Sequence, residues 1–212
     1  MKSFDAIISL GCDCQVASQL QLHGLRKYAL PFDWLLTPCI TKILENKFEG
    51  FMTPDNFEFV VSETDGKYVL DKKYQTRLLH DFKMQEDFLK DYEEIAAKYD
   101  RRIERLYNII SSSDNPLFIR KGLSKEQAIV LQEIISKMRD GRSFLLTVLN
   151  DEPEPNWQLE NVRNFQFIQP NKYVLGDSNS WRELFDILGL TTSNTNTWNE
   201  IYHEMGLTKD SK

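Results

Sequence analysis

Hydrophobic residues recur every three or four positions between residues 86 and 110, and this spacing predicts one long amphipathic helix. The repeat consists of Phe88, Tyr92, Ile95, Tyr99, Ile103, Leu106 and Ile110. The polar stretch SSSDNP follows directly and ends the helix. A shorter helical pattern over residues 40–51 places Ile43, Leu44 and Phe48 on one face.

Short, continuous apolar runs predict strands that are covered on both faces. They are AIISL at 6–10, PLFIR at 116–120, SFLLTVL at 143–149 and, less apolar, FQFIQ at 165–169. Helical patterns lie between several of these runs, so crossover connections and therefore a parallel sheet are expected.

Capping signals support the helices around these strands. Asp13 is a candidate N-cap that makes Cys14 the first residue of a helix, which ends near Gly24. Ser124 and Gln127 form a predicted capping box for a helix that ends at Met138. Asp177 or Ser178 begins a last helix, which carries Trp181, Leu184, Phe185 and Leu188 and is closed by Gly189.

The order of elements predicts an α/β fold, with a mainly parallel sheet flanked by helices in a Rossmann-like, three-layer arrangement. Residues 1–190 are expected to form one domain. The alternating segments FEFVV and KYVLD predict a small β or loop excursion around residues 50–85. Residues 191–212 are expected to be a polar linker and a short C-terminal helix.

Composition narrows the class of protein. A net charge of −6 without a basic block argues against nucleic-acid binding, and no apolar run reaches the length of a membrane span. The first residues do not resemble a signal peptide, and three cysteines are too few for a secreted disulfide scaffold. We therefore expect a cytoplasmic protein that needs no metal or cofactor, and the oligomeric state stays open.

Cys14 is the strongest candidate for chemistry. Ligands of open parallel sheets gather beyond the carboxyl ends of the strands, where residues 11–14, 120–122 and 150–152 fall. A thiol at a helix N-terminus meets unpaired amides that favour the thiolate. The backbone amides of Cys14 and Gln15 could also stabilise an oxyanion. The alternatives are a small buried core residue, or a metal clip with Cys12, Cys39 and His80.

A thiol nucleophile requires a base, and the sequence offers three histidines. His23 lies at a helix end and is expected to face solvent or cap carbonyls, and His203 is near the C-terminus. His80 precedes the long helix in the segment RLLHDF, a junction that suits a functional side chain, although a capping role is the alternative. Its neighbour Asp81 could cap the helix or bind substrate.

The segment PFDW commits two aromatic residues and a carboxylate to one proline-flanked loop, so Asp33 and Trp34 are candidate substrate-binding residues. Arg26 and Arg120 are candidate clamps for an anionic group. Core packing and ordinary ion pairs are the alternative roles for these four side chains.

Taken together, ISLGCDCQVASQL, GLRKYALPFDW, LLHDF and PLFIRKGLSKEQAIVLQEII resemble a bacterial family of unknown function described as papain-like cysteine peptidases. The resemblance covers roughly residues 4–190 and implies an α+β papain-like fold as an alternative. It implies that Cys14 is the nucleophile and His80 its base, with Asp81 or another carboxylate as the third member.

The resulting hypothesis is a cysteine-dependent hydrolase that transfers the acyl group of a small-molecule or peptide-like substrate. A domain that binds or transfers a sugar or nucleotide is an alternative, as is a non-catalytic interaction module. In both alternatives, Cys14 is structural.

Overall fold

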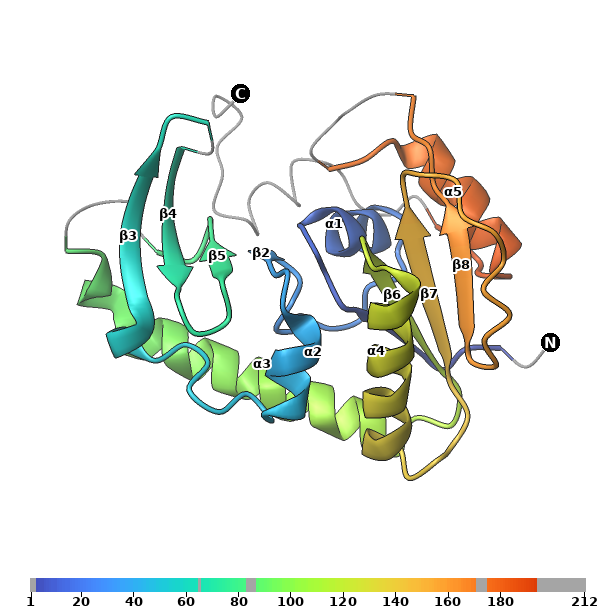
Figure 1. Cartoon of the computed structure of the whole chain (residues 1–212), viewed down its shortest axis with the longest axis horizontal. Helices are drawn as coiled ribbons and strands as arrows, with labels where there is room; N and C mark the ends of the chain where they lie inside the picture. The colour runs from blue at the N-terminus through green and yellow to red at the C-terminus, as the bar shows by residue number, and fades with distance from the viewer. Residues whose placement is uncertain (1–2, 65, 83–86, 171–174, 194–212) are drawn as a thin grey trace.

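A computed structural model describes residues 3–64, 66–82, 87–170 and 175–193. It contains two four-stranded sheets, and helices pack around both of them (Figure 1). Most of the predicted C-terminal linker and helix lies outside the described residues.

The first sheet is entirely parallel, in the order β1-β6-β7-β8. Its strands are β1 (Ala6–Ser9), β6 (Pro116–Lys121), β7 (Leu145–Asn150) and β8 (Val162–Gln166). β8 starts three residues before the predicted run at 165–169, because its pairing with β7 fixes the register. The connection from β7 to β8 contains no helix, contrary to the expected alternation.

Helices cover both faces of this parallel sheet (Figure 1). On one face, α1 (Gln15–Leu22) and α5 (Ser178–Ile187) contribute Val16, Leu20, Trp181 and Phe185 to a core shared with Leu117 and Ile119. On the other face, α2 (Ile40–Glu45), α3 (Tyr92–Ser112) and α4 (Lys125–Met138) share a larger core with Ile8 and Phe118.

The predicted N-caps of α4 and α5 are present, whereas the boundaries of α2 and α3 differ from the predictions. The predicted capping box at Ser124 and Gln127 is present, and Asp177 caps α5 by accepting the Ser180 amide at 2.9 Å. α3 begins at Tyr92 after a 3-10 turn over Phe88–Asp91. α2 ends at Glu45, although Phe48 remains in the core as predicted.

The second sheet is antiparallel, in the order β2-β5-β4-β3. It consists of β2 (Leu35–Leu36), β3 (Phe57–Ser62), β4 (Gly66–Asp71) and β5 (Thr76–Leu78). The small excursion expected around residues 50–85 is thus part of a sheet with as many strands as the parallel one. The fold is therefore mixed α/β, with one parallel and one antiparallel sheet. The sequence did not indicate β2, because a strand of two residues has no periodic signal of its own.

The short strand β2 connects the two sheets. Leu36 forms a parallel bridge with Cys12, which lies in the turn after β1, and the Thr37 amide donates to the Cys12 carbonyl at 3.3 Å. On its other side, Leu35 pairs with Leu78 of β5. Cys14 follows Cys12 by two residues and His80 follows Leu78 by two, so β2 brings both segments to one junction.

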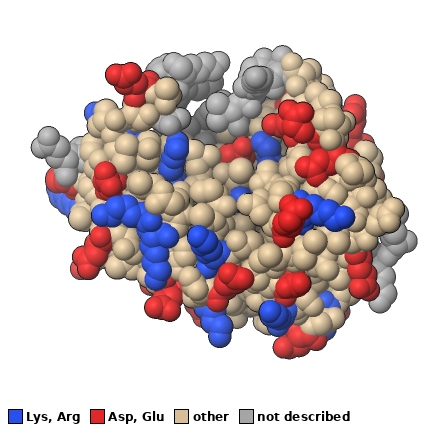
Figure 2. Space-filling model, in the orientation of Figure 1, with Lys and Arg blue, Asp and Glu red and all other residues tan. Residues whose placement is uncertain are grey.

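The described part of the chain has no helix long and apolar enough to cross a membrane. Figure 2 shows acidic and basic side chains interspersed on the face that it displays.

Candidate functional site

A sharp turn between β1 and α1 positions Cys14. Gly11 has φ +69°, and a Cβ atom there would lie 2.5 Å from the Phe32 carbonyl oxygen, so the turn requires glycine. Cys12 also has a positive φ of 99°. α1 begins at Gln15, one residue later than predicted, so Cys14 and not Asp13 is its N-cap residue. The Asp13 carboxylate, one position before the N-cap, accepts the Gln15 amide at 2.9 Å.

The Cys14 thiol lies beside the imidazole of His80. The distance from Cys14 Sγ to His80 Nε2 is 3.5 Å, although the two residues are 66 positions apart in the chain. This distance is within sulfur hydrogen-bond range, so the imidazole can take the proton of the thiol directly.

The pKa shifts of Cys14 and His80 do not favour the thiolate that the sequence predicted. Cys14 is only 4% exposed, and this burial, together with Asp13 and Asp81, raises the pKa of its thiol to about 12. Its own backbone amide lowers the pKa, but by less than burial raises it. Burial also lowers the pKa of His80, against the opposing effect of Asp81. Both directions favour a neutral thiol next to a neutral imidazole.

One of the two predicted oxyanion donors is already engaged. The Gln15 amide donates to Asp13, and the Gln15 side-chain oxygen accepts from Gln169 Nε2 at 2.8 Å. The Cys14 amide interacts with its own sulfur. Of the two predicted amide donors, only that of Cys14 remains, because the Gln15 amide already donates to Asp13.

Asp81 does not orient the His80 ring. Its carboxylate accepts from Lys98 Nζ and, at 2.6 Å, from the Tyr99 hydroxyl. His80 Nδ1 is buried and has no hydrogen-bond partner among the described residues. The arrangement is thus a Cys–His pair, with Asp81 held nearby by α3. Sequence reasoning missed Lys98 and Tyr99, because Tyr99 fits the apolar repeat of α3 as well as a phenylalanine would.

The PFDW segment forms the wall behind Cys14. Trp34 belongs to the same packed cluster as Cys14, Ala17 and Leu175. Arg26 lies over the Trp34 ring, 5.2 Å from its centroid, and its guanidinium donates to Asp33 at 3.1 and 2.8 Å. Asp33 is 1% exposed. Burial raises the pKa of Asp33 despite the opposing Arg26 charge. Asp33 thus forms a buried ion pair beside the Cys14 cluster.

Arg120 is buried rather than presented to solvent. Its guanidinium donates to the carbonyls of Leu10 at 2.8 Å and Thr37 at 2.6 Å. These carbonyls belong to the turn after β1 and to the segment after β2. Arg120 therefore braces the junction between the two sheets in this structure.

His23 is fully buried, so of its two expected roles the solvent-facing one is wrong, whereas the contact with a helix carbonyl is present. Its Nδ1 lies 2.9 Å from the Gln19 carbonyl, and its ring packs edge-on against Phe185 of α5. It therefore packs between α1 and α5.

Among the described residues, no cluster of three or more His, Cys, Asp and Glu side chains is arranged to hold a metal ion, and Cys12, Cys14 and Cys39 are free thiols. The proposed four-ligand metal clip is not assembled by the described residues.

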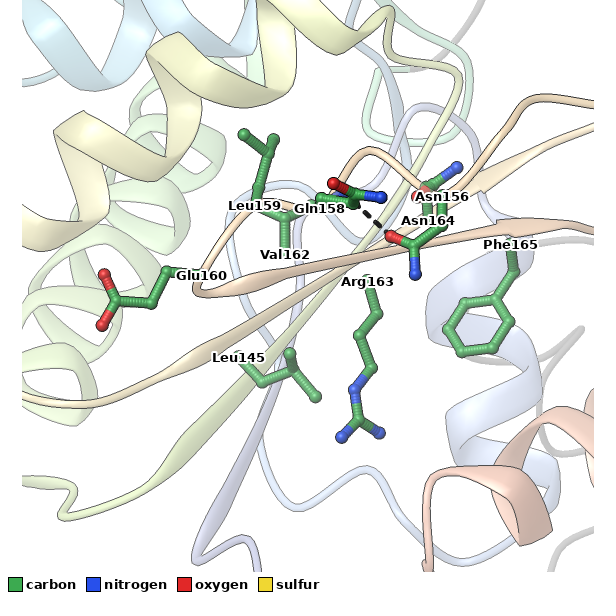
Figure 3. A pocket seen from close by; sticks show the side chains of 9 residues that line it. All are labelled: Leu145, Asn156, Gln158, Leu159, Glu160, Val162, Arg163, Asn164 and Phe165. Atoms are coloured by element: carbon green, nitrogen blue, oxygen red, sulfur yellow. Dashed lines mark hydrogen bonds between the residues drawn. The ribbon is translucent and has the colours of Figure 1, made fainter.

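The described part of the chain has a pocket beside β8 and a smaller one beside α3. The larger, of about 490 Å³, is lined by residues of β7, β8 and the loop between them, including Leu145, Val162 and Arg163 (Figure 3). The lining runs along β8 from Val162, its first residue, to Phe165, so this pocket lies beside the edge strand of the parallel sheet, and Cys14 is not among its lining residues. The smaller, of about 270 Å³, is lined by Asp81, Asp91, Glu94, Ile95 and Lys98, and so lies next to His80.

Comparison with known proteins places these residues in a family. The sequence profile of the family described as "Putative papain-like cysteine peptidase (DUF1796)" matches residues 5–146, which include Cys14, His80, Asp81 and Arg120. An uncharacterized protein of Acanthamoeba polyphaga mimivirus is 31% identical to this chain over an alignment 219 residues long. The alignment covers 87% of this chain and 98% of the viral protein.

This relative is viral, whereas the sequence resemblance was to a bacterial family. No solved structure matches the chain. Because the profile spans well over half of the chain, the protein belongs to the DUF1796 family, whose description is "Putative papain-like cysteine peptidase".

Proposed function

We propose that this protein is a cysteine-dependent hydrolase or acyltransferase in which Cys14 is the nucleophile and His80 the general base. The 3.5 Å approach of Cys14 Sγ to His80 Nε2 is the observation that carries the proposal. The family description of a cysteine peptidase supports it.

The first half of the reaction acylates Cys14. Its sulfur forms a bond to the substrate carbonyl carbon, the C=O π electrons move onto oxygen, and His80 Nε2 takes the thiol proton. When the C=O bond re-forms, the bond to the leaving amine or alcohol breaks, and His80 returns the proton to that group. The product is a thioester on Cys14.

The second half reverses these roles with water. His80 removes a proton from a water molecule as its oxygen attacks the thioester, and the carbon–sulfur bond breaks to regenerate the thiol. If an amine or alcohol attacks in place of water, the same steps give acyl transfer.

The surrounding residues act as positioning groups in this proposal. Arg26 and Asp33 fix the PFDW segment behind the thiol, and Arg120 holds the turn that carries it. Asp81 supplies negative charge near His80 and favours the imidazolium that forms during acylation. Asp81 acts only through its charge in this proposal, because its two carboxylate oxygens accept hydrogen bonds from Lys98 and Tyr99.

A thiol that is 4% exposed favours small-molecule or extended, peptide-like carbonyl substrates over folded proteins. Three free thiols suit a reducing compartment, so we propose a cytoplasmic location. We also propose that residues 1–190 fold as one domain, whose parallel half is of the Rossmann-like, three-layer class.

Acylation by p-nitrophenyl acetate, followed by intact-protein and peptide mass spectrometry, tests the assignment. We expect a thioester on Cys14, none in Cys14→Ala, and acylation roughly 100-fold slower in His80→Ala. Cys12→Ser and Cys39→Ser are the matched controls and should acylate at the wild-type rate. Acylation that persists in Cys14→Ala, or is lost equally in Cys12→Ser, would overturn the proposal.

A further inference from the structure

Trp34 is the residue of the Cys14 cluster whose chemistry is unaccounted for. It is 2% exposed and packs in the cluster formed with Cys14, Ala17 and Leu175. Its indole Nε1–H is buried and has no hydrogen-bond partner among the described residues. An indole nitrogen can only donate, so nothing but an acceptor can satisfy it.

A buried donor without an acceptor costs free energy, and most proteins avoid leaving one. Here the indole is also held in place. The Arg26 guanidinium covers its ring at 5.2 Å, and Arg26 is in turn fixed by its ion pair with Asp33. The fold thus fixes an unsatisfied N–H in the packed shell of the nucleophile.

The site also lacks one donor. An oxyanion that forms at the carbon attacked by Cys14 requires preorganised hydrogen-bond donors. The Cys14 amide lies next to its own sulfur, whereas the Gln15 amide is committed to Asp13. One backbone donor therefore remains where oxyanion sites commonly use two or more.

We infer that the Trp34 indole N–H is the second oxyanion donor of this site and acts together with the Cys14 amide. The inference rests on the proposed function and names a further catalytic residue for it. As Cys14 Sγ bonds to the carbonyl carbon and the π electrons move to oxygen, the oxygen becomes a strong acceptor for the indole N–H. In the resting protein the indole has no described acceptor, so the interaction stabilises the tetrahedral state selectively.

An aldehyde and an alkylating agent separate this role from packing. N-acetyl-phenylalaninal adds to the thiol: a carbon–sulfur bond forms, the π electrons move to oxygen, and His80 Nε2 takes the thiol proton, which gives a reversible adduct that carries negative charge on its oxygen. Iodoacetamide also forms a carbon–sulfur bond, but iodide leaves and no oxyanion develops. Aldehyde affinity is measured as protection of Cys14 from iodoacetamide, with N-acetyl-phenylalaninol as the control that cannot add.

We expect Trp34→Phe to weaken the aldehyde about 100-fold while the rate of Cys14 alkylation stays within about twofold of wild type. Replacement of Trp34 by β-(3-benzothienyl)alanine, which exchanges the N–H for sulfur and keeps the bicyclic ring, should give the same result and guards against misfolding. Trp181→Phe is the matched control, since Trp181 Nε1 is also buried without a described partner but packs in a different cluster.

The outcomes separate the two proposals. Wild-type affinity for the aldehyde in both Trp34 variants would overturn the oxyanion role and leave Cys14 as the nucleophile. Equal losses in aldehyde affinity and alkylation rate would overturn it as well and assign Trp34 a packing role. If the aldehyde gives the wild type no more protection than the alcohol does, the nucleophile assignment itself fails.

Discussion

At the scale of single residues, the main physical feature is a neutral pair. Burial and neighbouring carboxylates raise the pKa of the Cys14 thiol to about 12, and burial lowers the pKa of His80. In the proposed reaction, these directions favour proton transfer that accompanies attack by sulfur over a resting thiolate–imidazolium pair. The proposed mechanism in this respect resembles that of a serine nucleophile with a histidine base.

The pH dependence of the acylation rate tests whether Cys14 and His80 form a neutral pair. Below its lowered pKa, His80 is protonated and cannot act as a base, so acylation by p-nitrophenyl acetate should rise with pH and then level off. The midpoint of the rise should lie below about pH 6.5, the usual pKa of histidine, and the plateau should extend beyond about pH 9 because Cys14 stays protonated. Stopped-flow acylation rates in a Cys12→Ser, Cys39→Ser background measure the profile. A bell-shaped profile that falls between pH 7 and 9 would instead indicate an ion pair.

At the scale of elements, α1 and α5 are joined through His23. The ring is fully buried, lies 2.9 Å from the Gln19 carbonyl and 3.4 Å from the Ser178 hydroxyl, and packs on Phe185. Burial lowers its pKa, and the nearby Arg182 acts in the same direction. Because α1 carries Cys14 at its N-terminal end, the docking of α5 supports the helix behind the nucleophile.

This contact predicts an acid-sensitive contribution to stability. Since the folded pKa of His23 lies below its unfolded value of about 6.5, the unfolded chain binds more protons in acid. The contribution is complete above that value and is lost as the pH falls toward the folded pKa. We expect the free energy of unfolding in urea to decline less between pH 7 and 5 in His23→Gln than in the wild type. Parallel declines would show that His23 does not set the slope.

At the scale of the whole molecule, the site exists because two sheets meet. Cys14 follows a strand of the parallel sheet and His80 follows β5 of the antiparallel one, and β2 joins the two through Cys12 and Leu78. Arg120 reinforces the junction with hydrogen bonds to Leu10 and Thr37. A guanidinium is suited to this role because its fixed fork of donors can reach two carbonyls at once.

The brace can be broken without touching the reacting atoms. Arg120→Met leaves two buried carbonyls without their donors and should lower the free energy of unfolding by roughly 2–5 kcal/mol. Acylation of Cys14 should slow as well, while Arg120→Lys, which keeps the charge and some donors, should lose less of both. Urea denaturation and the acylation assay measure the two effects. Arg101→Met on the exposed side of α3 is the control, and equal stability of the two methionine variants would refute the brace.

The sequence was sufficient wherever the signal was local. The stripe from Phe88 to Ile110 predicted most of α3, the pair Ser124 and Gln127 predicted the start of α4, and three apolar runs predicted β1, β6 and β7. Such features depend on side chains a few positions apart, which one sequence displays directly. The candidate residues Cys14 and His80 could also be selected from the sequence, because each lies at a predicted junction of elements.

The arrangement of the site depended on contacts between distant segments. No pattern in the chain specifies that Leu35 pairs with Leu78, that Lys98 and Tyr99 occupy Asp81, or that Arg120 turns inward to Leu10. The protonation of Cys14 followed the same rule, since burial by residues remote in sequence outweighed the helix amides that sequence position alone suggested. Local spacing therefore fixed the elements and the candidates, whereas long-range packing set the distance, the desolvation and the remaining hydrogen-bond donors on which the chemistry depends.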